Sequence, residues 1–289
     1  MSDPRGLLGR YDLRPRKSLG QNFLVDATAP DRIAECAGLS VEDTVLEVGA
    51  GVGTLTAALA RRAGAVIAVE TDPMLLDVLR VEMAAYPNVR IVHGDILTLD
   101  PVTLLSVLPS EPAKPLWGVR LPHYHVVANL PYYITNAVVR HLLEARVRPQ
   151  QMVLTVQREV AERIVAQPGD MSLLAVSVQF YGKPELCLRL RRGAFFPPPK
   201  VESAVVRVRI HEEPLFEVAD VGQFFRIVKA GFSQRRKQLR NSLASSLPLD
   251  PHSVEAALQG QGIDPTRRAE TLSMAEWGRT SAALALMLV

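Results

Sequence analysis

The residues Asn129-Leu130-Pro131-Tyr132 bring together groups that could align a planar amine for a reaction. The side-chain oxygen of Asn129 and the carbonyl of Leu130 are neighbouring hydrogen-bond acceptors, and Pro131 restricts the backbone that follows them. Tyr132 places an aromatic face beside these acceptors. Such a set suits a planar base with an exocyclic amine, which suggests methylation of adenine at N6. An ordinary turn with a packed tyrosine has the same composition, so the motif alone decides little.

The elements that would position this motif begin with an apolar run at residues 126–128, which predicts a buried strand ending at Asn129. Earlier in the chain, residues 44–48 also predict a buried strand, and Gly49-Ala50-Gly51-Val52-Gly53 follows it directly. Residues 54–62 then have helical spacing. Strand, glycine turn and helix form a nucleotide-binding arrangement. The glycine spacing differs from the dinucleotide fingerprint and no Walker lysine follows, so a ligand without phosphate fits better.

Two acidic residues occupy corresponding positions after the next two strands. Residues 65–69 form an apolar strand that leads into Glu70, at the distance from the glycines where a carboxylate can bind ribose hydroxyls. A helix over residues 73–85 leads to a strand at 89–92, which is followed by Gly94-Asp95. The Asp95 carboxylate can accept a hydrogen bond from an adenine amino group.

Each of these features has a second interpretation. The glycine turn could be plain strand-to-helix geometry, Glu70 a solvated charge at a strand end, and Asp95 an N-cap before Ile96. Their order along the chain favours the functional interpretation, because all of them and Asn129 would lie at the carboxyl edge of one parallel sheet. Ligands of open α/β folds bind at that edge.

Six ordered blocks extend over nearly the whole chain: residues 17–24 (KSLGQNFL), the turn at 47–53, Glu70, Gly94-Asp95, residues 129–132, and residues 195–203, which match F-x-P-x-P-x-V-x-S. In these blocks the chain resembles the KsgA family of small-subunit ribosomal RNA adenine dimethyltransferases, and more broadly the adenine-N6 methyltransferases that use S-adenosylmethionine. The resemblance implies an α/β fold, with a Rossmann-like class I S-adenosylmethionine-dependent methyltransferase domain and a smaller all-helical C-terminal domain.

The resemblance implies roles for individual residues. The cofactor S-adenosylmethionine is expected to contact Gln21, Asn22, Leu24, Gly49, Gly51, Glu70, Asp95 and Asn129. The expected catalytic set is Asn129, Leu130, Pro131, Tyr132 and Phe195, in which the two aromatic rings stack on the base or, alternatively, pack in the core. The expected reaction is direct methyl transfer from the sulfonium to N6, repeated to give the dimethylated base. No strong general base is needed.

Composition narrows the class of protein. The chain has 289 residues, a formal net charge of +3 and a sequence pI near 9.0. Cys36 and Cys187 are far apart in sequence and lack a C-x-x-C context, which favours reduced thiols over a disulfide or zinc site. The six histidines are scattered, so we expect no metal. The sequence lacks a long apolar span and a secretory signal, so we expect a cytoplasmic protein without a membrane partner.

We predict two domains. Residues 1–210 would form the catalytic domain, with a flexible basic arm at 1–16, and residues 211–289 a helical domain that binds RNA or the ribosome. A Pro-rich segment at 108–125 is interpreted as a loop inserted before the strand that leads to Asn129. Helical spacing in the C-terminal part occurs at 224–232, 237–247, 254–258 and 274–288.

Positive charge concentrates in two clusters. One is Arg189, Arg191 and Arg192, beside the segment that begins at residue 195; the other is Arg235, Arg236, Lys237 and Arg240. A basic cluster is most often a solvated surface. In a chain that resembles an RNA-modifying enzyme, the same residues would bind RNA phosphates, while shape and single-stranded loops guide selection.

The resemblance implies a substrate, namely two adjacent adenosines in the 3′-terminal hairpin loop of small-subunit (16S) rRNA, met by a monomeric enzyme in a pre-30S particle. The main rival is the related large-subunit (23S) rRNA adenine N6-methyltransferase that confers macrolide resistance. The sequence Asn-Leu-Pro-Tyr-Tyr and residues 236–243 favour the first reading. A different alternative is a ribosome assembly factor that acts mainly by binding, and the intact cofactor and Asn129 motifs argue against it.

Overall fold

The computed structural model describes residues 3–106, 123–213 and 215–288. Most of the predicted Pro-rich insertion at residues 108–125 lies outside these ranges. The chain divides into two compact units, Met1–Ala161 with Pro184–Ile210, and Glu162–Lys183 with His211–Val289. The second unit therefore takes residues 162–183 from within the range predicted as catalytic, so the division is not a single cut at residue 210.

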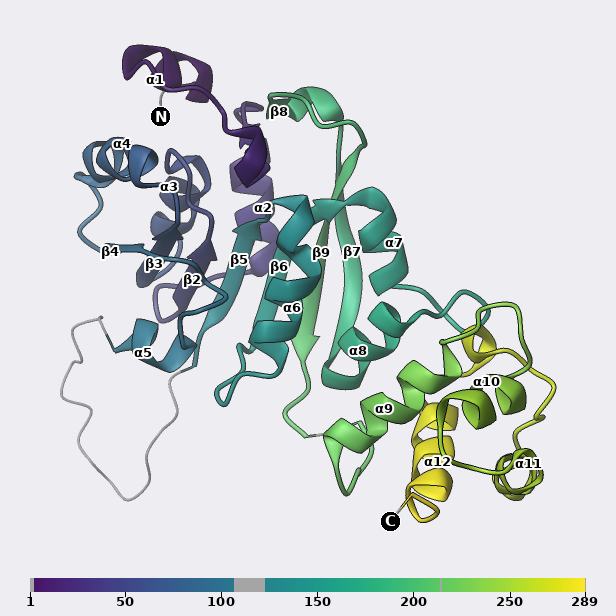
Figure 1. Cartoon of the computed structure of the whole chain (residues 1–289). Helices are drawn as coiled ribbons and strands as arrows, with labels where there is room; N and C mark the ends of the chain where they lie inside the picture. The colour runs from purple at the N-terminus through teal and green to yellow at the C-terminus, as the bar shows by residue number, and fades with distance from the viewer. Residues whose placement is uncertain (1–2, 107–122, 214, 289) are drawn as a thin grey trace, which may run out of the picture. The chain divides into compact units, whose positions relative to one another are not determined.

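In the described residues, the first unit is built on a seven-stranded sheet with the order β4-β3-β2-β5-β6-β9-β7 (Figure 1). β4, β3, β2, β5 and β6 are parallel to one another, whereas β9 runs antiparallel to β6. The strands predicted at 44–48, 65–69, 89–92 and 126–128 are confirmed to within one residue at each end. The sheet comprises β2 (Thr44–Val48), β3 (Ala65–Glu70), β4 (Val89–His93), β5 (His125–Asn129), β6 (Gln151–Gln157), β7 (Gly182–Leu190) and β9 (Ser203–Ile210).

Helices cover both faces of this sheet, which is why its central parallel strands are nearly continuous apolar runs. Figure 1 shows α6 in front of the sheet and α2 behind it. Helices α2, α3 and α4 contribute to one hydrophobic core with buried strand residues such as Val45 and Val66. The helices of this layered unit are α2 (Ala29–Ala37), α3 (Thr54–Ala60), α4 (Pro73–Met83), α5 (Pro101–Leu105) and α6 (Thr135–Leu143).

Strand β2 lies between β3 and β5, so the order of the strands reverses beside it. Open α/β folds bind ligands at such a reversal, outside the carboxyl ends of the strands. The glycine turn follows β2, Glu70 ends β3 and Asn129 ends β5. The fold therefore brings the residues singled out in the sequence to one edge of the sheet.

The N-terminal segment contains a helix within the arm predicted at residues 1–16. Helix α1 (Pro4–Arg10) begins with Asp3, whose side chain accepts the Arg5 N–H, and has a proline in its first turn. Leu7 and Leu8 are buried in a small core with Phe23 and other apolar residues. Residues 4–10 of the predicted arm are therefore helical, because two adjacent leucines supply an apolar contact.

A short antiparallel pair of strands follows the arm, with β1 (Phe23–Leu24) against β8 (Phe195–Phe196). The register places Leu24 opposite Phe195, and Phe23 opposite Phe196. The described part of the same unit also contains single-turn 3₁₀ helices at Lys17–Leu19, Tyr132–Ile134 and Arg192–Ala194. The pairing connects the sequence block at 17–24 to the block at 195–203.

The second unit is helical and has an aromatic core. The rings of Phe180 and Phe224 stack with their centroids 4.7 Å apart. The helices predicted at 224–232, 254–258 and 274–288 are confirmed, whereas α10 begins at Leu239 instead of residue 237, because Gln238 is extended. Its helices are α8 (Leu173–Tyr181), α9 (Val221–Gly231), α10 (Leu239–Ser246), α11 (Pro251–Gly260) and α12 (Met274–Ala285), and α7 (Arg158–Ile164) spans the division between the two units.

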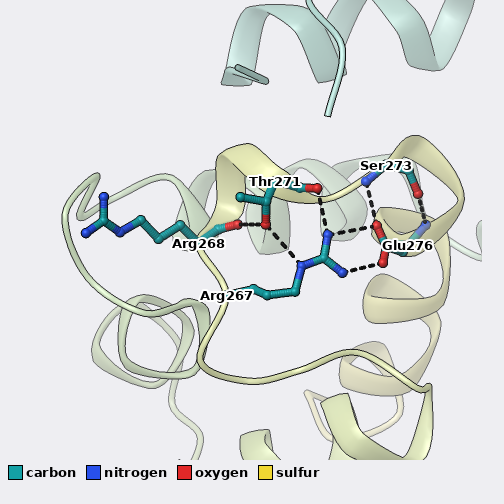
Figure 2. A network of polar contacts seen from close by, with 5 residues as sticks. All are labelled: Arg267, Arg268, Thr271, Ser273 and Glu276. Carbon is teal, nitrogen blue, oxygen red and sulfur yellow. Dashed lines mark hydrogen bonds and ion pairs between the residues drawn. The ribbon is translucent and has the colours of Figure 1, made fainter. Parts of the chain in front are cut away.

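A polar network fixes the loop that precedes α12 (Figure 2). The Arg267 guanidinium donates to both carboxylate oxygens of Glu276 and to the carbonyl of Thr271. Arg267 is the main reason that the pKa of Glu276 is lowered to about 2. Ser273 and Glu276 form a capping box at the start of α12. The carbonyl of Arg267 accepts the Leu239 N–H at 2.6 Å, so the same network sets where α10 begins.

Candidate active site

A pocket lies at the carboxyl edge of the parallel strands, where the strand order reverses. Its walls come from the residues after β2, β3, β4 and β5 and from residues 19–24 of the N-terminal segment. All the residues predicted to contact the cofactor line this pocket, namely Gln21, Asn22, Leu24, Gly49, Gly51, Glu70, Asp95 and Asn129. The motif residues Leu130, Pro131 and Tyr132 line it as well.

The glycine turn brings the backbone close to the pocket. Gly49, Gly51 and Gly53 have φ values of 76°, 60° and 85°, which L side chains rarely adopt. A Cβ atom on Gly51 would also lie 3.2 Å from the Phe23 ring. The glycines are therefore required by backbone conformation, and at Gly51 by space as well.

Glu70 is a buried acceptor and not the solvated strand-end charge of the second interpretation. Its side chain is 5% exposed, and its carboxylate accepts the backbone N–H groups of Gly51, Thr71 and Asp72 at 2.7, 2.9 and 2.8 Å. Burial raises the pKa of Glu70, and the three backbone hydrogen bonds oppose that shift by favouring the carboxylate. A carboxylate has about four lone-pair sites, so it can still accept ligand hydroxyls.

Glu47 is a pocket residue that the sequence analysis did not single out. Its side chain is 1% exposed, and within the described residues its Oε2 atom has no hydrogen-bond partner. The hydroxyl of Thr54, which also lines the pocket, is likewise buried without a partner. Burial raises the pKa of Glu47 to about 8. Buried polar groups without partners are rare, so this pair marks a place where a ligand with hydrogen-bond donors or positive charge fits.

Asp95 lies in the turn after β4 and does not begin a helix, so the N-cap interpretation is wrong. Its side chain accepts the Leu97 N–H at 3.0 Å, which stabilises this turn. It is also exposed and lines the pocket next to Gly94. The carboxylate is therefore held by the turn after β4 at the wall of the pocket.

Asn129 has its side-chain orientation set by the N-terminal segment. The Asn129 Nδ2 atom donates to the backbone carbonyl of Asn22 at 3.0 Å. Because the nitrogen end of the amide is engaged, its oxygen is the end that can accept a hydrogen bond from a ligand amine. The side chain of Leu130 is only 2% exposed, which anchors the backbone that carries the neighbouring carbonyl.

The two aromatic residues of the predicted catalytic set differ. Tyr132 is partly buried, lines the pocket, and its hydroxyl is hydrogen-bonded to that of Ser203 at 2.6 Å. Phe195 is 1% exposed and belongs to the main hydrophobic core, so its predicted stacking on a base is wrong for this arrangement. In β8 the two phenylalanines belong to different clusters. Phe195 packs with its partner Leu24 in the main core, and Phe196 packs with its partner Phe23 in the small core.

The predicted RNA-binding cations are mostly exposed. Arg189, Arg191 and Arg192 lie at the end of β7 and just after it, in the first unit. In the second unit, Arg235, Arg236 and Lys237 are exposed in the turn between α9 and α10, and not on a helix. Arg240 differs from these, because its guanidinium forms an ion pair with Glu255 at 2.8 Å.

The two cysteines are free, and their thiols are close in space although they are far apart in sequence. The pKa of Cys36 is raised to about 12, chiefly by burial and then by the Cys187 thiol beside it. Among residues 3–106, 123–213 and 215–288, no group of three or more His, Cys, Asp or Glu side chains could hold a metal ion. Over the same ranges every helix is too short or too polar to span a membrane.

Comparison with known proteins identifies a family that matches most of the chain. The family model described as ribosomal RNA adenine dimethylase matches residues 13–286. A protein of Dehalococcoides mccartyi named ribosomal RNA small subunit methyltransferase A is 46% identical over 277 residues, which cover 96% of this chain and 91% of that protein. The protein of the same name from Moorella thermoacetica is 45% identical over 280 residues, with 96% and 95% covered.

Solved structures share the fold. The 23S rRNA methyltransferase ErmE has a TM-score of 0.71 and 32% identity, and the match covers 91% of this chain and 100% of that chain. A dimethyladenosine transferase from Plasmodium falciparum has a TM-score of 0.69 and 23% identity, with 87% and 93% covered. The predicted Rossmann-like class I methyltransferase fold with a helical C-terminal part is thereby confirmed.

Proposed function

Because the chain belongs to the ribosomal RNA adenine dimethylase family, we propose that it dimethylates the N6 amines of two adjacent adenosines in the 3′-terminal hairpin loop of small-subunit rRNA, with S-adenosylmethionine as methyl donor. The observation that carries this proposal is the Asn129 amide at the end of β5. Its nitrogen is engaged by the Asn22 carbonyl, which leaves its oxygen to accept an N–H of the target amine.

The pocket residues fit the cofactor. S-adenosylmethionine supplies a methyl group that is already activated by the positive sulfonium. Glu70 is the residue that would hold the ribose hydroxyls, and Asp95 would accept the adenine amine. The Glu47 Oε2 atom, which has no hydrogen-bond partner among the described residues, suits the cationic amino-acid end. The backbone of the glycine turn allows close approach.

The chain's own residues contribute orientation more than acid–base chemistry. The lone pair of the adenine amine is delocalised into the ring, so the amine is a poor nucleophile. Acceptors at Asn129 Oδ1 and the Leu130 carbonyl would align both N–H bonds and draw the nitrogen toward tetrahedral geometry. Holding two reactants in near-attack geometry can lower the barrier by about 7–11 kcal/mol. No strong base is required for this step.

The target base has to leave its stack before it reaches Asn129, at a free-energy cost of a few kcal/mol. The Tyr132 ring, held by the Ser203 hydroxyl, offers a face on which the base can stack. Stacking on an aromatic side chain contributes about 1–3 kcal/mol per base. The ring therefore offsets a large part of that cost.

The particle that presents the hairpin is part of the proposal. We propose a monomeric, cytoplasmic enzyme that acts on a pre-30S particle. Catalysis takes place in the unit of Met1–Ala161 and Pro184–Ile210, and the helical unit contributes to RNA contact. The exposure of Arg189, Arg191 and Arg192, and of the basic turn at residues 235–237, supports phosphate binding by both parts.

A second candidate substrate is large-subunit rRNA, because ErmE, a 23S rRNA methyltransferase, is 32% identical over most of this chain. Unmethylated small and large subunits are incubated separately with labelled S-adenosylmethionine, and the labelled base is mapped. We expect dimethyladenosine in the 3′-terminal hairpin of the small subunit. Label in the large subunit alone would favour the second candidate, and binding without label would favour an assembly factor.

The basic turn gives a prediction about salt. Replacing Arg235, Arg236 and Lys237 with Gln should weaken binding to unmethylated small subunits and flatten the log–log salt dependence by roughly 0.7–0.9 per lost phosphate contact. Arg240→Gln should have a smaller effect, since this guanidinium is already paired with Glu255. A solvated surface predicts parallel salt slopes, with stability changed by less than about 0.5 kcal/mol. Parallel slopes would indicate that RNA contacts the protein elsewhere, at Arg189, Arg191, Arg192 and the N-terminal segment.

Glu47 gives a prediction about pH in the cofactor-free protein. Its pKa is raised from 4.5 to about 8 in the folded state, so protonation favours the folded state, and stability is lost as pH rises from about 5 through 8. The loss is at most about 1.4 kcal/mol per pH unit. Urea unfolding at pH 5, 6, 7 and 8 should show wild type losing stability relative to Glu47→Gln. If the stability of the two proteins changed with pH in parallel, the raised pKa of Glu47 would be contradicted.

A further inference from the structure

The N-terminal wall of the pocket is anchored to a buried carboxylate, that of Asp72, which is 2% exposed. One of its oxygens accepts the Gln21 side-chain amide at 2.8 Å, and the other pairs with the Arg16 guanidinium at 3.1 Å. The backbone N–H of Arg16 also donates to the Gln21 side-chain oxygen at 2.8 Å. Arg16 and Gln21 are therefore clamped together on one carboxylate.

Asp72 has a second task that has to be separated from this one. It is the N-cap of α4, where it accepts the Met74 N–H at 3.1 Å. Capping alone does not require a carboxylate, since Asn caps a helix about as well as Asp. The negative charge and the second acceptor oxygen are used by Arg16 and Gln21.

The residue after Gln21 contacts the proposed catalytic amide. The Asn22 backbone carbonyl accepts the Asn129 Nδ2 hydrogen at 3.0 Å. A carbonyl can only accept, so it favours the amide orientation that turns the nitrogen toward it and the oxygen away. If residues 16–22 shifted, this carbonyl would move and the Asn129 amide would no longer be held in one orientation.

We propose that Asp72 is a positioning residue for methyl transfer. By holding Gln21 and Arg16 it fixes the Asn22 carbonyl, which in turn orients the Asn129 amide toward the target amine. This inference rests on the proposed role of Asn129. In this arrangement the N-terminal segment lines the cofactor pocket and also orients a group that takes part in methyl transfer.

The test is Asp72→Asn, which keeps the helix cap and the side-chain volume but presents an amide to Gln21 and Arg16. With saturating labelled S-adenosylmethionine and unmethylated small subunits, we expect the single-turnover rate to fall at least tenfold, by more than the change in cofactor Kd. The matched control is Asp220→Asn, because Asp220 is the N-cap of α9 and accepts the backbone N–H groups of Gly222 and Gln223. Its saturating rate should equal that of wild type.

A double variant that exchanges the two side-chain types distinguishes a positioning role of Asp72 from a general loss of structure. In D72N/Q21E the donor and acceptor change places, while the carboxylate introduced at position 21 can still accept the Arg16 N–H. At saturating cofactor we expect D72N/Q21E to be at least threefold faster than D72N. Gln21→Glu alone should stay slow, because two carboxylates then face each other.

The outcomes are distinguishable from a failure of the proposed function. If wild type is active and Asn129→Ala is inactive, but folded D72N has the wild-type saturating rate, the positioning role is refuted and the proposed function stands. A double variant D72N/Q21E as slow as D72N would also refute it. If Asn129→Ala retains activity, the proposed role of Asn129 fails first.

Discussion

Asn129→Ala should reduce methyl transfer to unmethylated small subunits by at least about 100-fold, while the affinity for S-adenosylmethionine stays within a few-fold of wild type. Removing one preorganised hydrogen-bonding group from an active site typically lowers kcat by about 10²–10³. The cofactor is held mainly by other groups in the pocket, so its affinity should change little. Turnover with labelled cofactor and calorimetric binding, measured on the same preparation, give the two quantities.

Asn88→Ala is the matched control for this substitution. The Asn88 side chain also donates to backbone carbonyls, those of Ala60 and Ala63, but it does not line the pocket. We expect it to lower thermal stability and to leave the saturating turnover rate unchanged. Dimethylation by folded Asn129→Ala at the wild-type rate would refute the role of Asn129.

The parts of the site that lie at strand ends could be predicted from the sequence because apolar runs locate strands and parallel strands share one carboxyl edge. The glycine turn, Glu70, Asp95 and Asn129 were all found in this way, and all of them line the pocket. Periodicity and order along the chain were sufficient here, because each position depends on its own strand and not on a distant partner.

The orientation of the Phe195 side chain could not be predicted from periodicity and order along the chain. Its motif identifies the residue, but whether the ring faces the pocket or the core depends on which strand pairs with β8. That partner is β1, which lies far away in sequence, and side chains alternate between the two faces of a strand. A register that places Phe195 opposite the buried Leu24 directs it into the core.

The ionic partners of charged residues could not be predicted from the sequence either. Nothing local distinguishes Arg240, which is paired with Glu255, from the exposed Arg236. Asp72 and Glu47 are both buried acids, yet one is clamped by the N-terminal segment and the other has an oxygen without a partner in the described chain. These differences arise from tertiary contacts, which composition and spacing do not encode at single residues.

Glu70→Ala should weaken the binding of S-adenosylmethionine by about tenfold to a hundredfold. A hydrogen bond to a charged group contributes about 1.5–3 kcal/mol, and the ribose hydroxyls would lose this acceptor. The substitution also removes the carboxylate that accepts the Gly51 N–H, so the glycine turn loses a hydrogen bond that holds it in place beside the pocket. Calorimetric titration measures the affinity, and circular dichroism establishes that the variant is folded.

A surface carboxylate supplies the comparison for this last result. Glu35 is exposed and pairs with Arg62 at 3.6 Å, outside the pocket, so Glu35→Ala should leave the cofactor affinity unchanged. Glu70→Gln keeps one acceptor oxygen and turns an amide toward the backbone donors, so its affinity should fall between those of wild type and Glu70→Ala. A folded Glu70→Ala with wild-type affinity would mean that the ribose is held elsewhere. In that case the three backbone N–H groups around Glu70 would account for its burial on their own.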